Sequence, residues 1–543
     1  MQKHRLRPEL CAFLLAAFVV GCLNLQFWRL LYQFVAPSAP HDWLFLASVA
    51  VVVLGLTNLL FGAFAVPYVF KPVMTILLLM AAAAAYFMDE YGTVIDPGLV
   101  RNIVETNTAE VRDLLTVKLL AYLGLAGALP VILLWRTHIA YRSATRELVF
   151  KALATVVSLI ILAMVVVPFS NAYLSVFREQ RQLLFFVSPI NSLNAIFKFA
   201  GKRQYAAPPQ LVAIGEDARK GDAWASRTAR SLTVIVVGET ARAANFSLNG
   251  YARPTNPRLS RIPGLINFPH AYSCGTDTAS SLPCMFSNFG RSKFDANLAA
   301  QRENLLDVVQ RAGIAVNWRE NQSGCKGVCL RVPTEVLVEA KPRAFYEIGD
   351  ALDEALLRDL PDRFKALDRD GLFVLHMMGS HGPAYYKRYP PRFEAFTPAC
   401  KEAQFSRCSQ EQIVNAYDNT LVYTDHVLGE LIALLEEEDR QGRPTAMIYL
   451  SDHGESLGEA NLYLHGMPYV LAPDQQKHVP MLLWLSPSYQ QVFAVDTACL
   501  AARTERPVSH DNLFHSVLGL LDIKTKLYDA KLDIFAGCRR SSD

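Results

Sequence analysis

Two threonine hydroxyls, those of Thr276 and Thr278, lie within the segment Cys274–Cys284. They stand just before or at the start of a predicted short helix, Thr278–Ser287, whose N-terminus would stabilise a phosphate group. A threonine hydroxyl is a weak nucleophile at its ordinary pKa, and coordination to a divalent metal ion is one way to activate it. An isolated threonine there more often caps the helix, so a nucleophile requires metal ligands elsewhere in the chain.

Candidate metal ligands follow three apolar runs that have the length of strands. A single Asp or Glu after a strand is usually a turn or capping residue, but such residues at three strand ends are much less frequent by chance. In open α/β sheets, ligands bind outside the carboxyl ends of the strands, so these side chains are expected to meet at one edge. The runs and the side chains that follow them are Leu232–Val237 with Glu239, Gly371–Met377 with His381, and Ala446–Leu450 with Asp452 and His453.

The donor types of these side chains indicate a particular metal. Glu239, Asp452 and His453 supply oxygen and nitrogen donors, which suit tetrahedral zinc when a hydroxyl is the fourth ligand; manganese is a lesser alternative. His465 can join His381 at a second metal or at a phosphate oxygen, although His465 taken alone is equally well a loop histidine.

Two further basic side chains have less definite roles. Lys326 lies between Cys325 and Cys329 and can offer a fixed cation to phosphate, but a solvated surface lysine is the more common case. His376 falls inside a predicted strand and is expected to be a hydrogen-bonded core residue.

The first third of the 543-residue chain carries five uncharged apolar runs. Each is long enough, or nearly long enough, to cross a bilayer, which takes roughly 20 residues. Lysine and arginine residues before the first run and between the fourth and fifth place both regions in the cytoplasm, so everything after Tyr173 faces away from it. The predicted spans are Leu10–Trp28, Trp43–Phe70, Pro72–Met88, Leu119–Trp135 and Ala152–Tyr173.

The ten cysteines agree with this orientation. Cys11 and Cys22 lie in the first span, and the other eight lie in the part that faces away from the cytoplasm. An even set in an oxidising compartment indicates disulfides. Three pairs are close in sequence and two cysteines remain as a fourth pair, although the sequence leaves the connectivity open. These candidates are Cys274 and Cys284, Cys325 and Cys329, Cys400 and Cys408, and Cys499 and Cys538.

The chain divides into a transmembrane domain, residues 1–173, an interfacial bridge and linker, residues 174–230, and a catalytic domain, residues 231–543. Within the bridge, Ser188–Phe199 is amphipathic enough to lie on a membrane surface. Gly201–Arg230 is polar, which predicts a linker.

In the last domain, apolar runs, which also include Met481–Leu485, alternate with helical patterns such as Leu305–Ala312 and Gln412–Glu438. Such runs are typical of strands buried on both faces of a parallel sheet. The predicted fold is a five-helix transmembrane domain followed by an α/β sandwich with a mainly parallel sheet. A net charge of +3, with no basic stripe interleaved with aromatics, disfavours nucleic acid as a partner. A monomer is expected.

Five segments, in this order along the chain, carry a resemblance to a known family. They are Val-Gly-Glu239-Thr-Ala-Arg, Asn249–Asn256, Cys274-Gly-Thr-Asp-Thr-Ala, Ser-His381-Gly-Pro-Ala-Tyr and Ser451–Gly458. Together they resemble bacterial phosphoethanolamine transferases acting on lipid A. That group includes the mobilised colistin-resistance enzymes and belongs to the alkaline phosphatase/sulfatase superfamily. The resemblance covers essentially the full chain.

By this resemblance, Thr278 is the nucleophile and becomes a phosphoethanolamine-threonine. The same resemblance implies a zinc site made of Glu239, Thr278, Asp452 and His453. Asp277, between the two threonines, departs from the small polar residue of some relatives, with no expected change in mechanism.

The resemblance also implies roles for the remaining basic groups. His381 and His465 bind a second zinc ion or the substrate phosphate, either of them can be the general acid, and Lys326 assists. Glu455 is a weaker candidate for this second metal or phosphate site. One zinc ion is expected, or two if the second site also binds metal.

The family binds its lipid donor through the outward loop after the third span. Asn102, Thr106 and Glu110 recur every four residues there, which places them on one helical face. A solvated polar face is the ordinary interpretation of that spacing. With the resemblance, these residues become candidates for binding the donor headgroup.

The implied activity is transfer of phosphoethanolamine from phosphatidylethanolamine to a lipid A phosphate, with release of diacylglycerol and weaker binding of cationic peptides such as polymyxin. The protein is expected in the bacterial inner membrane, with its catalytic domain in the periplasm. The alternative is the same transfer onto a lipopolysaccharide core sugar or another periplasmic glycan. A sulfatase or phosphodiesterase is more distant, because the Thr278 segment lacks Cys/Ser-x-Pro-x-Arg. The intact ligand set disfavours a degenerate lipid-binding sensor.

Overall fold

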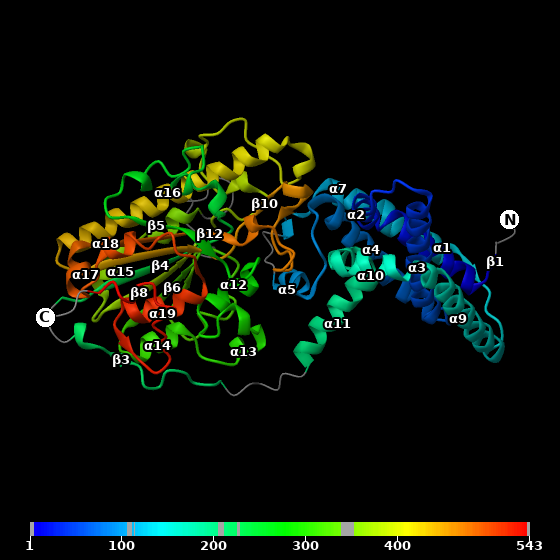
Figure 1. Cartoon of the computed structure of the whole chain (residues 1–543), viewed down its shortest axis with the longest axis horizontal. Coiled ribbons are helices and arrows are strands. Elements are labelled where there is room, and N and C mark those ends of the chain that lie inside the picture. The colour runs from blue at the N-terminus through cyan, green and yellow to red at the C-terminus, as the bar shows by residue number, and fades with distance from the viewer. Residues whose placement is uncertain are drawn as a thin grey trace. The chain divides into compact units, whose positions relative to one another are not determined.

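The computed structural model describes residues 5–105, 111–112, 114–204, 211–224, 229–337 and 352–539. The chain forms two compact units, Met1–Val104 with Leu114–Gln204, and Glu105–Asp113 with Tyr205–Asp543. The described residues of the first unit are almost entirely helical, whereas the second contains an eight-stranded sheet (Figure 1).

Four helical segments of the first unit are long and apolar enough to cross a membrane, and a bent helix pair makes a fifth if it is counted as one span. The predicted number of spans therefore agrees with the upper count. The four segments are α3 (Pro40–Ala63), α4 (Phe70–Tyr91), the run Val117–Arg136 made of α7 (Val117–Tyr122), η1 (Leu123–Ala128) and α8 (Leu129–Arg136), and the run Ala144–Arg178, which contains α9 (Ala144–Val166), η2 (Val167–Phe169) and most of α10 (Ser170–Glu179).

The first predicted span, Leu10–Trp28, is wrong as one continuous helix, because α1 (Pro8–Cys22) and α2 (Leu25–Val35) meet at an angle of 59°. Asn24 occupies the break, and its side-chain amide donates to the carbonyl oxygens of Val19 and Ser188, each at 2.9 Å. The buried Asn24 amide thus ties the break between α1 and α2 to the backbone at Ser188.

The second predicted span, Trp43–Phe70, extends too far at its C-terminal end. Helix α3 ends at Ala63, and Phe70 already begins α4. Pro67 lies in the connection, where its missing N–H and fixed φ oppose a continuous helix.

The predicted bridge contains packed segments. Helix α11 (Ile190–Gln204) includes most of the predicted amphipathic stretch. In the predicted linker, β3 (Arg219–Lys220) pairs antiparallel with β14 (Ile523–Lys524). The Trp224 indole donates to the carbonyl oxygen of Leu521 at 2.6 Å, so residues 219–224 pack against the end of the chain. Asn102 lies in α5 (Pro97–Glu105), whereas Thr106 and Glu110 fall outside the described residues.

The main sheet has the strand order β13-β5-β12-β9-β4-β8-β6-β7. All neighbouring strands in it are parallel except β12, which is antiparallel to both β5 and β9. The carboxyl ends of the other seven strands therefore share one edge. The strands are β4 (Leu232–Gly238), β5 (Ile266–Tyr272), β6 (Ala315–Glu320), β7 (Thr334–Val336), β8 (Gly371–His376), β9 (Thr445–Ser451), β12 (His478–Leu485) and β13 (Val508–Ser509).

The predicted strands near residues 232, 371 and 446 are confirmed as β4, β8 and β9, and each is buried along its whole length. The prediction that Met481–Leu485 runs parallel is wrong. This run belongs to β12, and the described connection from β9 to β12 contains no α-helix that could cross the sheet. A direct return of the chain to the neighbouring position gives an antiparallel pair.

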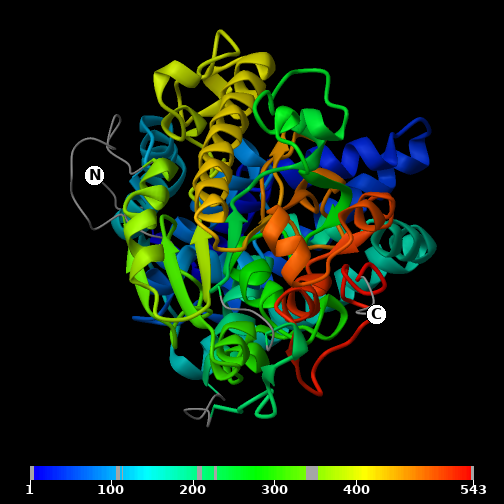
Figure 2. The ribbon, with the colours of Figure 1, turned by 90° about the vertical axis from the view of Figure 1, so that its left-hand side faces the viewer.

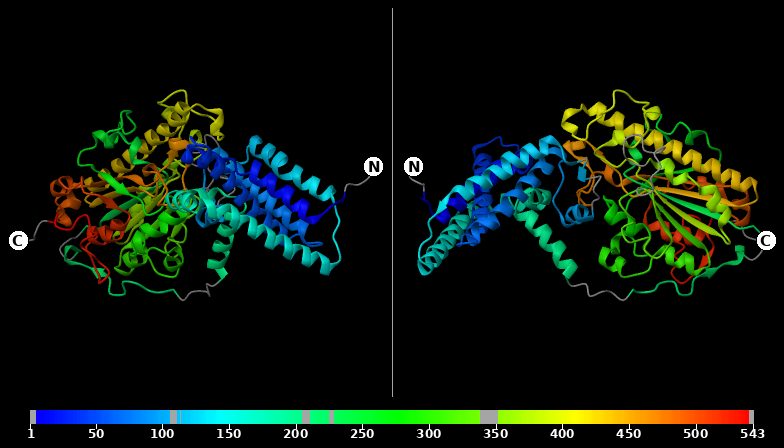
Figure 3. Two further views of the ribbon diagram at one scale, coloured as in Figure 1. Left: turned by 45° about the vertical axis from the view of Figure 1, so that its right-hand side comes forward. Right: turned by 180° about the vertical axis from the view of Figure 1, so that it is seen from behind.

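Helices cover both faces of the sheet, as Figures 1, 2 and 3 show. Leu282, Val309 and Phe514 share one core with strand residues such as Ile235, while α16 packs on the opposite face with α15. The predicted helices at 305–312 and 412–438 are confirmed as α14 and α16. The helices are α12 (Thr278–Met285), α13 (Ala296–Ala300), α14 (Leu305–Arg311), α15 (Leu360–Ala366), α16 (Gln410–Arg440), α17 (Pro487–Val492), α18 (Thr497–Ala501) and α19 (Asp511–Leu520).

The disulfide candidates are confirmed pair by pair, and Cys11 and Cys22 remain free. The bonds are Cys274–Cys284, Cys325–Cys329, Cys400–Cys408 and Cys499–Cys538.

Candidate active site

The ends of β4 and β9 bring three ionisable side chains together. One ligand atom from each of Glu239, Asp452 and His453 lies within 4.8 Å of the others. His453 Nε2 is 3.3 Å from Glu239 Oε1 and 3.4 Å from Asp452 Oδ2. All three residues are fully buried, so the predicted meeting of these residues at the sheet edge is present.

Thr278 adds a hydroxyl to this group, which we call the ligand cluster: Glu239, Asp452, His453 and Thr278. Its Oγ1 donates to Glu239 Oε2 at 3.2 Å and lies 3.4 Å from His453 Nε2. Thr278 is the first residue of α12, and Asp277 rather than Thr278 caps the helix by accepting from the Ser280 N–H at 2.9 Å. Because Asp277 does the capping, the Thr278 hydroxyl is directed at the cluster.

The other predicted hydroxyl has a structural contact instead. Thr276 Oγ1 donates to the carbonyl oxygen of Met467 at 2.6 Å, and the Gly466 N–H donates to the Thr276 carbonyl oxygen at 2.8 Å. These bonds join the loop before Thr278 to the loop that carries His465.

The ligand cluster fits a divalent cation. His453 Nδ1 lies 2.9 Å from the Gly454 carbonyl oxygen, which assigns a ring proton to Nδ1 and makes Nε2, which faces Glu239, the nitrogen that can bind a metal once it gives up its own proton. Asp452 Oδ2 is buried and accepts no hydrogen bond from any described residue. Two carboxylates, one imidazole nitrogen and one hydroxyl form an oxygen-rich donor set with this unpaired atom inside it.

The pKa values record the charge imbalance of the cluster without a cation. Burial and the neighbouring Glu239 charge raise the pKa of Asp452 to about 6. Burial opposes a charged His453, but the Asp452 charge and the Glu239 hydrogen bond raise its pKa to about 10. Burial likewise opposes an ionised Glu239, yet the hydrogen bond and charge of His453 hold its pKa well below the ordinary range.

The backbone around Glu239 is held in unusual conformations. Thr240 has φ +60°, which is rare for a β-branched residue and is tolerated where the surroundings enforce it. Its N–H donates to Asp452 Oδ1 at 3.1 Å, and its hydroxyl donates to Glu239 Oε1 at 2.5 Å. Sequence reasoning assigned Thr240 no role, although it stands within the Gly-Glu-Thr segment.

His465, His381 and Glu455 lie beside the cluster. The His465 ring centroid is 4.3 Å from that of His453 and 5.5 Å from that of His381. Glu455 Oε2 is 2.8 Å from His465 Nδ1, and Tyr385 donates its hydroxyl to Glu455 Oε1 at 2.5 Å. Sequence reasoning assigned Tyr385 no role, although it ends the Ser-His-Gly-Pro-Ala-Tyr segment.

Lys326 is not brought into hydrogen-bonding contact with the cluster among the described residues. Its ammonium donates to the Ser323 hydroxyl at 3.2 Å and to the Ser323 carbonyl oxygen at 3.3 Å.

The prediction for His376 as a satisfied core residue is only half correct. The residue is fully buried, and Nδ1 lies 2.9 Å from Glu320 Oε1. Its Nε2, however, has no hydrogen-bond partner in the described part of the chain.

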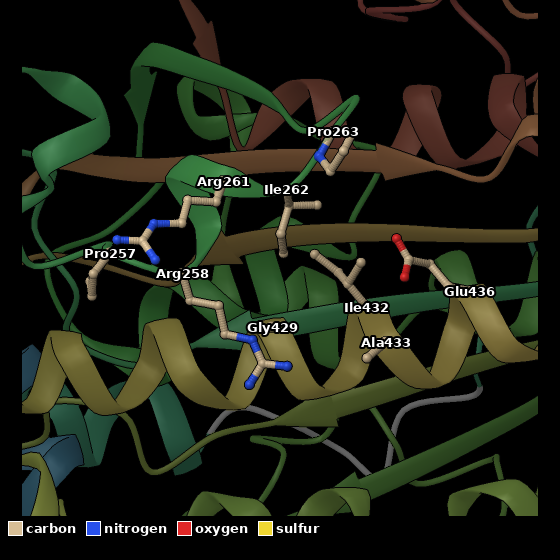
Figure 4. Close-up of a pocket in the computed structure, with 9 residues that line it drawn as sticks. All are labelled: Pro257, Arg258, Arg261, Ile262, Pro263, Gly429, Ile432, Ala433 and Glu436. Atoms are coloured by element: carbon tan, nitrogen blue, oxygen red, sulfur yellow. The ribbon is translucent and has the colours of Figure 1, made fainter.

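A surface groove of about 450 Å³ lies elsewhere in this unit, between residues 257–263 and α16 (Figure 4). None of the predicted site residues lines it. At Gly429 an added Cβ would lie 2.3 Å from the Arg258 side chain, which crosses the helix and pairs with Glu430, so a larger residue there would displace that side chain.

Fold and site together define a class of protein. A mainly parallel sheet carries a hydroxyl among metal-type ligands at its carboxyl edge, and residues 231–523 match the family model described as Sulfatase. The protein is thus a member of the alkaline phosphatase/sulfatase superfamily.

Comparison of the full chain narrows this class. Residues 53–204 match the family model described as Phosphoethanolamine transferase EptA/EptB. The chain is 42% identical to the phosphoethanolamine transferase EptA of Escherichia coli K12, over 98% of this chain and 97% of the relative. It is 35% identical to the phosphatidylethanolamine transferase Mcr-1 of Escherichia coli, over 96% of both. The chain belongs to the EptA family of phosphoethanolamine transferases.

A solved structure agrees along the whole chain. It is the integral membrane protein lipooligosaccharide phosphoethanolamine transferase A of Neisseria meningitidis, with a TM-score of 0.95 and 34% identity, covering 99% of this chain and 100% of that one. The present protein is likewise a multi-pass membrane protein with a sulfatase-like periplasmic domain.

Proposed function

We propose that the protein transfers phosphoethanolamine from phosphatidylethanolamine to a lipid A phosphate through a covalent intermediate on Thr278. The observation that carries this proposal is the Thr278 hydroxyl, 3.2 Å from Glu239 within a buried set of metal-type ligands. The names of the relatives, which mention phosphatidylethanolamine and lipooligosaccharide, support the choice of donor and acceptor. The proposal keeps residues 1–173 as the membrane domain and residues 231–543 as the catalytic domain.

A zinc ion held by Glu239, Asp452, His453 and Thr278 would lower the pKa of the Thr278 hydroxyl and offset charge on the transferring phosphoryl group. The hydroxyl proton leaves toward Glu239, its hydrogen-bond acceptor. Thr278 Oγ1 then attacks the donor phosphorus, and the bond from phosphorus to the glycerol oxygen breaks.

The departing glycerol oxygen needs a proton to become diacylglycerol. His465 suits this role because Glu455, itself held by Tyr385, orients its ring. His381, next to His465, is the alternative donor or a ligand for the substrate phosphate or for a second zinc ion. Lys326 and Asn102 remain candidates for contacts with the substrates, Lys326 only after its side chain leaves Ser323.

In the second step, an oxygen of the lipid A phosphate attacks the same phosphorus. The bond from phosphorus to Thr278 Oγ1 breaks, and Glu239 returns to that oxygen the proton it accepted in the first step. The acceptor phosphate is already anionic near neutral pH, so this step needs little general-base assistance. The product carries a zwitterionic group, which weakens attraction for polymyxin and other cationic peptides.

Intact-protein mass spectrometry after incubation with phosphatidylethanolamine tests the proposal. The wild type should gain one phosphoethanolamine group, and Thr278→Ala should gain none while its transfer rate falls by at least about 10³-fold. Thr278→Ala should keep bound zinc, whereas Glu239→Gln should lose most of it and Glu505→Gln, at an exposed carboxylate, should lose none. Lipid A that still gains phosphoethanolamine in cells with Thr278→Ala would contradict the assignment.

A further inference from the structure

A histidine outside the ligand cluster makes an unusual set of contacts. His510 immediately precedes α19, and only 1% of its surface is exposed. Its Nδ1 accepts a hydrogen bond from the Cys274 N–H at 3.0 Å, and its Nε2 donates to the Ser451 carbonyl oxygen at 2.9 Å. Its own backbone N–H donates to the Tyr272 carbonyl oxygen at 3.0 Å.

The two side-chain contacts lie on two catalytic segments. Cys274 follows β5 and begins the loop that leads to Thr278, while Ser451 ends β9 and directly precedes Asp452 and His453. Strands β5 and β9 are not neighbours, because β12 lies between them. The imidazole therefore connects the nucleophile segment to the ligand segment across an intervening strand.

Ser451 is in turn fixed to the rest of the cluster. Its hydroxyl donates to the His453 carbonyl oxygen at 3.0 Å and accepts from the Ala241 N–H at 2.9 Å. A shift of the Ser451 carbonyl group would thus be felt by His453 and by the backbone that follows Glu239.

Only some side chains can make this bridge. It needs an acceptor and a donor about 2 Å apart on one rigid group, and a neutral imidazole with its proton on Nε2 provides both. Burial lowers the pKa of His510 to about 3, so this neutral form is kept throughout the physiological range. Lysine and arginine offer no acceptor.

We propose that His510 is a positioning residue for phosphoethanolamine transfer, one that sets the place of the Thr278 hydroxyl relative to Glu239, Asp452 and His453. The proposal rests on the proposed function, because it assigns His510 no chemistry of its own. A displacement of about 1 Å between reacting groups can lower a rate by about 100-fold, so loss of the bridge should act on the rate rather than on donor binding.

Three substitutions in the full-length protein separate this role from simple packing. His510→Leu removes both contacts. His510→Asn keeps an acceptor for Cys274 but does not reach Ser451, and His510→Gln retains an acceptor and a donor at the tip of its side chain. The matched control is His515→Leu, because His515 is also buried in α19 but accepts from the Asp529 N–H at 3.1 Å, away from the ligand cluster.

The measured quantities are the rate of Thr278 loading, the KM for phosphatidylethanolamine, bound zinc and Tm. We expect His510→Leu to load Thr278 about 100-fold more slowly than the wild type, and His510→Asn at least about tenfold more slowly. In both variants KM should change by less than about twofold, and zinc should be retained. His510→Gln should recover part of the rate. His515→Leu should lower Tm and leave the loading rate unchanged.

Wild-type loading in His510→Asn would overturn the proposal, and this variant decides the matter if His510→Leu does not fold. A rate that falls only together with zinc loss, or an equal fall in His515→Leu, would also overturn it. Absence of any adduct on Thr278 in the wild type would instead refute the proposed function. Loading of the wild type is therefore measured before the variants are compared.

Discussion

At the scale of single residues, the charges around Thr278 favour the binding of a cation. Glu239 and Asp452 are completely buried, and two buried carboxylates without a counter-charge cost several kcal/mol. A proton on the His453 imidazole supplies such a counter-charge, as the raised pKa of His453 records. A divalent cation can replace the proton, which leaves His453 neutral and its Nε2 available as a ligand, so metal binding is coupled to proton release.

Gly379 offers a test of how closely the backbone must approach Glu239. Gly379 has φ +52°, and an added Cβ would lie 2.5 Å from the Glu239 carbonyl oxygen. Gly379→Ala must therefore move the Glu239 backbone. We expect a loss of about 1–3 kcal/mol of stability, together with reduced zinc content and transfer activity, measured by thermal unfolding and metal analysis.

The control is Gly442→Ala, because Gly442 has φ +87° and an added Cβ would meet nothing within 4 Å. This variant carries the backbone strain alone, so it should be destabilised while zinc and activity stay normal. Equal zinc loss in both variants would show that strain rather than displacement of Glu239 is responsible.

His510 also predicts a pH dependence of stability. Its pKa is about 3 in the folded protein and about 6.5 in an unfolded chain. The unfolded state therefore binds the proton more readily, so the contribution of His510 is complete above pH 6.5 and is lost as the pH falls toward 3, at about 1.4 kcal/mol per pH unit. With a chelator present, the Tm of the wild type should fall more steeply between pH 6 and pH 4 than the Tm of His510→Gln. Parallel curves would contradict the neutral buried state of His510.

At the scale of elements, strand direction decides what meets at the active site. Seven of the eight strands share a carboxyl edge, which gathers the ends of β4, β5, β8 and β9. The three apolar runs before Glu239, His381 and Asp452 were predictable because strands buried on both faces lack polar interruptions. Their shared edge followed from the general rule for open sheets.

Strand β5 was not predictable in the same way. In Ile266–Tyr272, buried residues are interspersed with half-buried ones, and the strand contains Pro269 and His270, so it lacks the continuous apolar character of β4. Its neighbour β12 is antiparallel, and the apolar pattern of a strand does not indicate whether that strand runs parallel or antiparallel to its neighbours. The approach of Thr278 to Glu239 depends on both strands, which is why the sequence indicated the residues of the site more securely than their contacts.

Contacts made by single flexible side chains were even less predictable. The position of Lys326 between two cysteines suggested a cation directed at phosphate, but its hydrogen bonds go to Ser323. His510 carried no signal at all, because a lone histidine before a helix has no characteristic pattern. Its partners come from β5 and β9, more than 50 residues away in sequence.

The disulfides differ in the length of chain that they close. Cys499–Cys538 spans 39 residues and Cys325–Cys329 spans 4. If the bonds act by restricting the unfolded chain, replacing the first pair with serine should cost about 2 kcal/mol more than replacing the second. Thermal unfolding of the two double variants in detergent would measure this difference. Equal losses would mean that local packing, rather than loop length, sets the contribution of each bond.

At the scale of the whole molecule, we expect the membrane unit to bring the sulfatase-like unit to the proposed lipid substrates. The proposed donor and acceptor are both lipids with apolar tails, so they are concentrated in a membrane rather than dissolved in water. The helical segments of the first unit keep the sulfatase-like unit attached to that surface. Attachment of this kind raises the effective concentration of one partner near another without any new contact.

Cleavage of the chain between α11 and residue 211 isolates this effect. A protease site can be inserted between Gln204 and Leu211. One preparation can then be assayed before and after cleavage. Once sedimentation has removed the membranes, the released C-terminal part, which lacks residues 105–113 of the second unit, should retain zinc and the disulfides, because the ligand cluster and all eight disulfide cysteines follow residue 211. Its loading of Thr278 from phosphatidylethanolamine vesicles should fall by about 10²-fold or more, the usual scale of a lost tether. Loading from a water-soluble phosphoethanolamine ester should change little, since that donor reaches the site from solution in either form.

An unchanged rate on vesicles would mean that the released part captures membrane lipid by itself. The membrane unit would then have a different task.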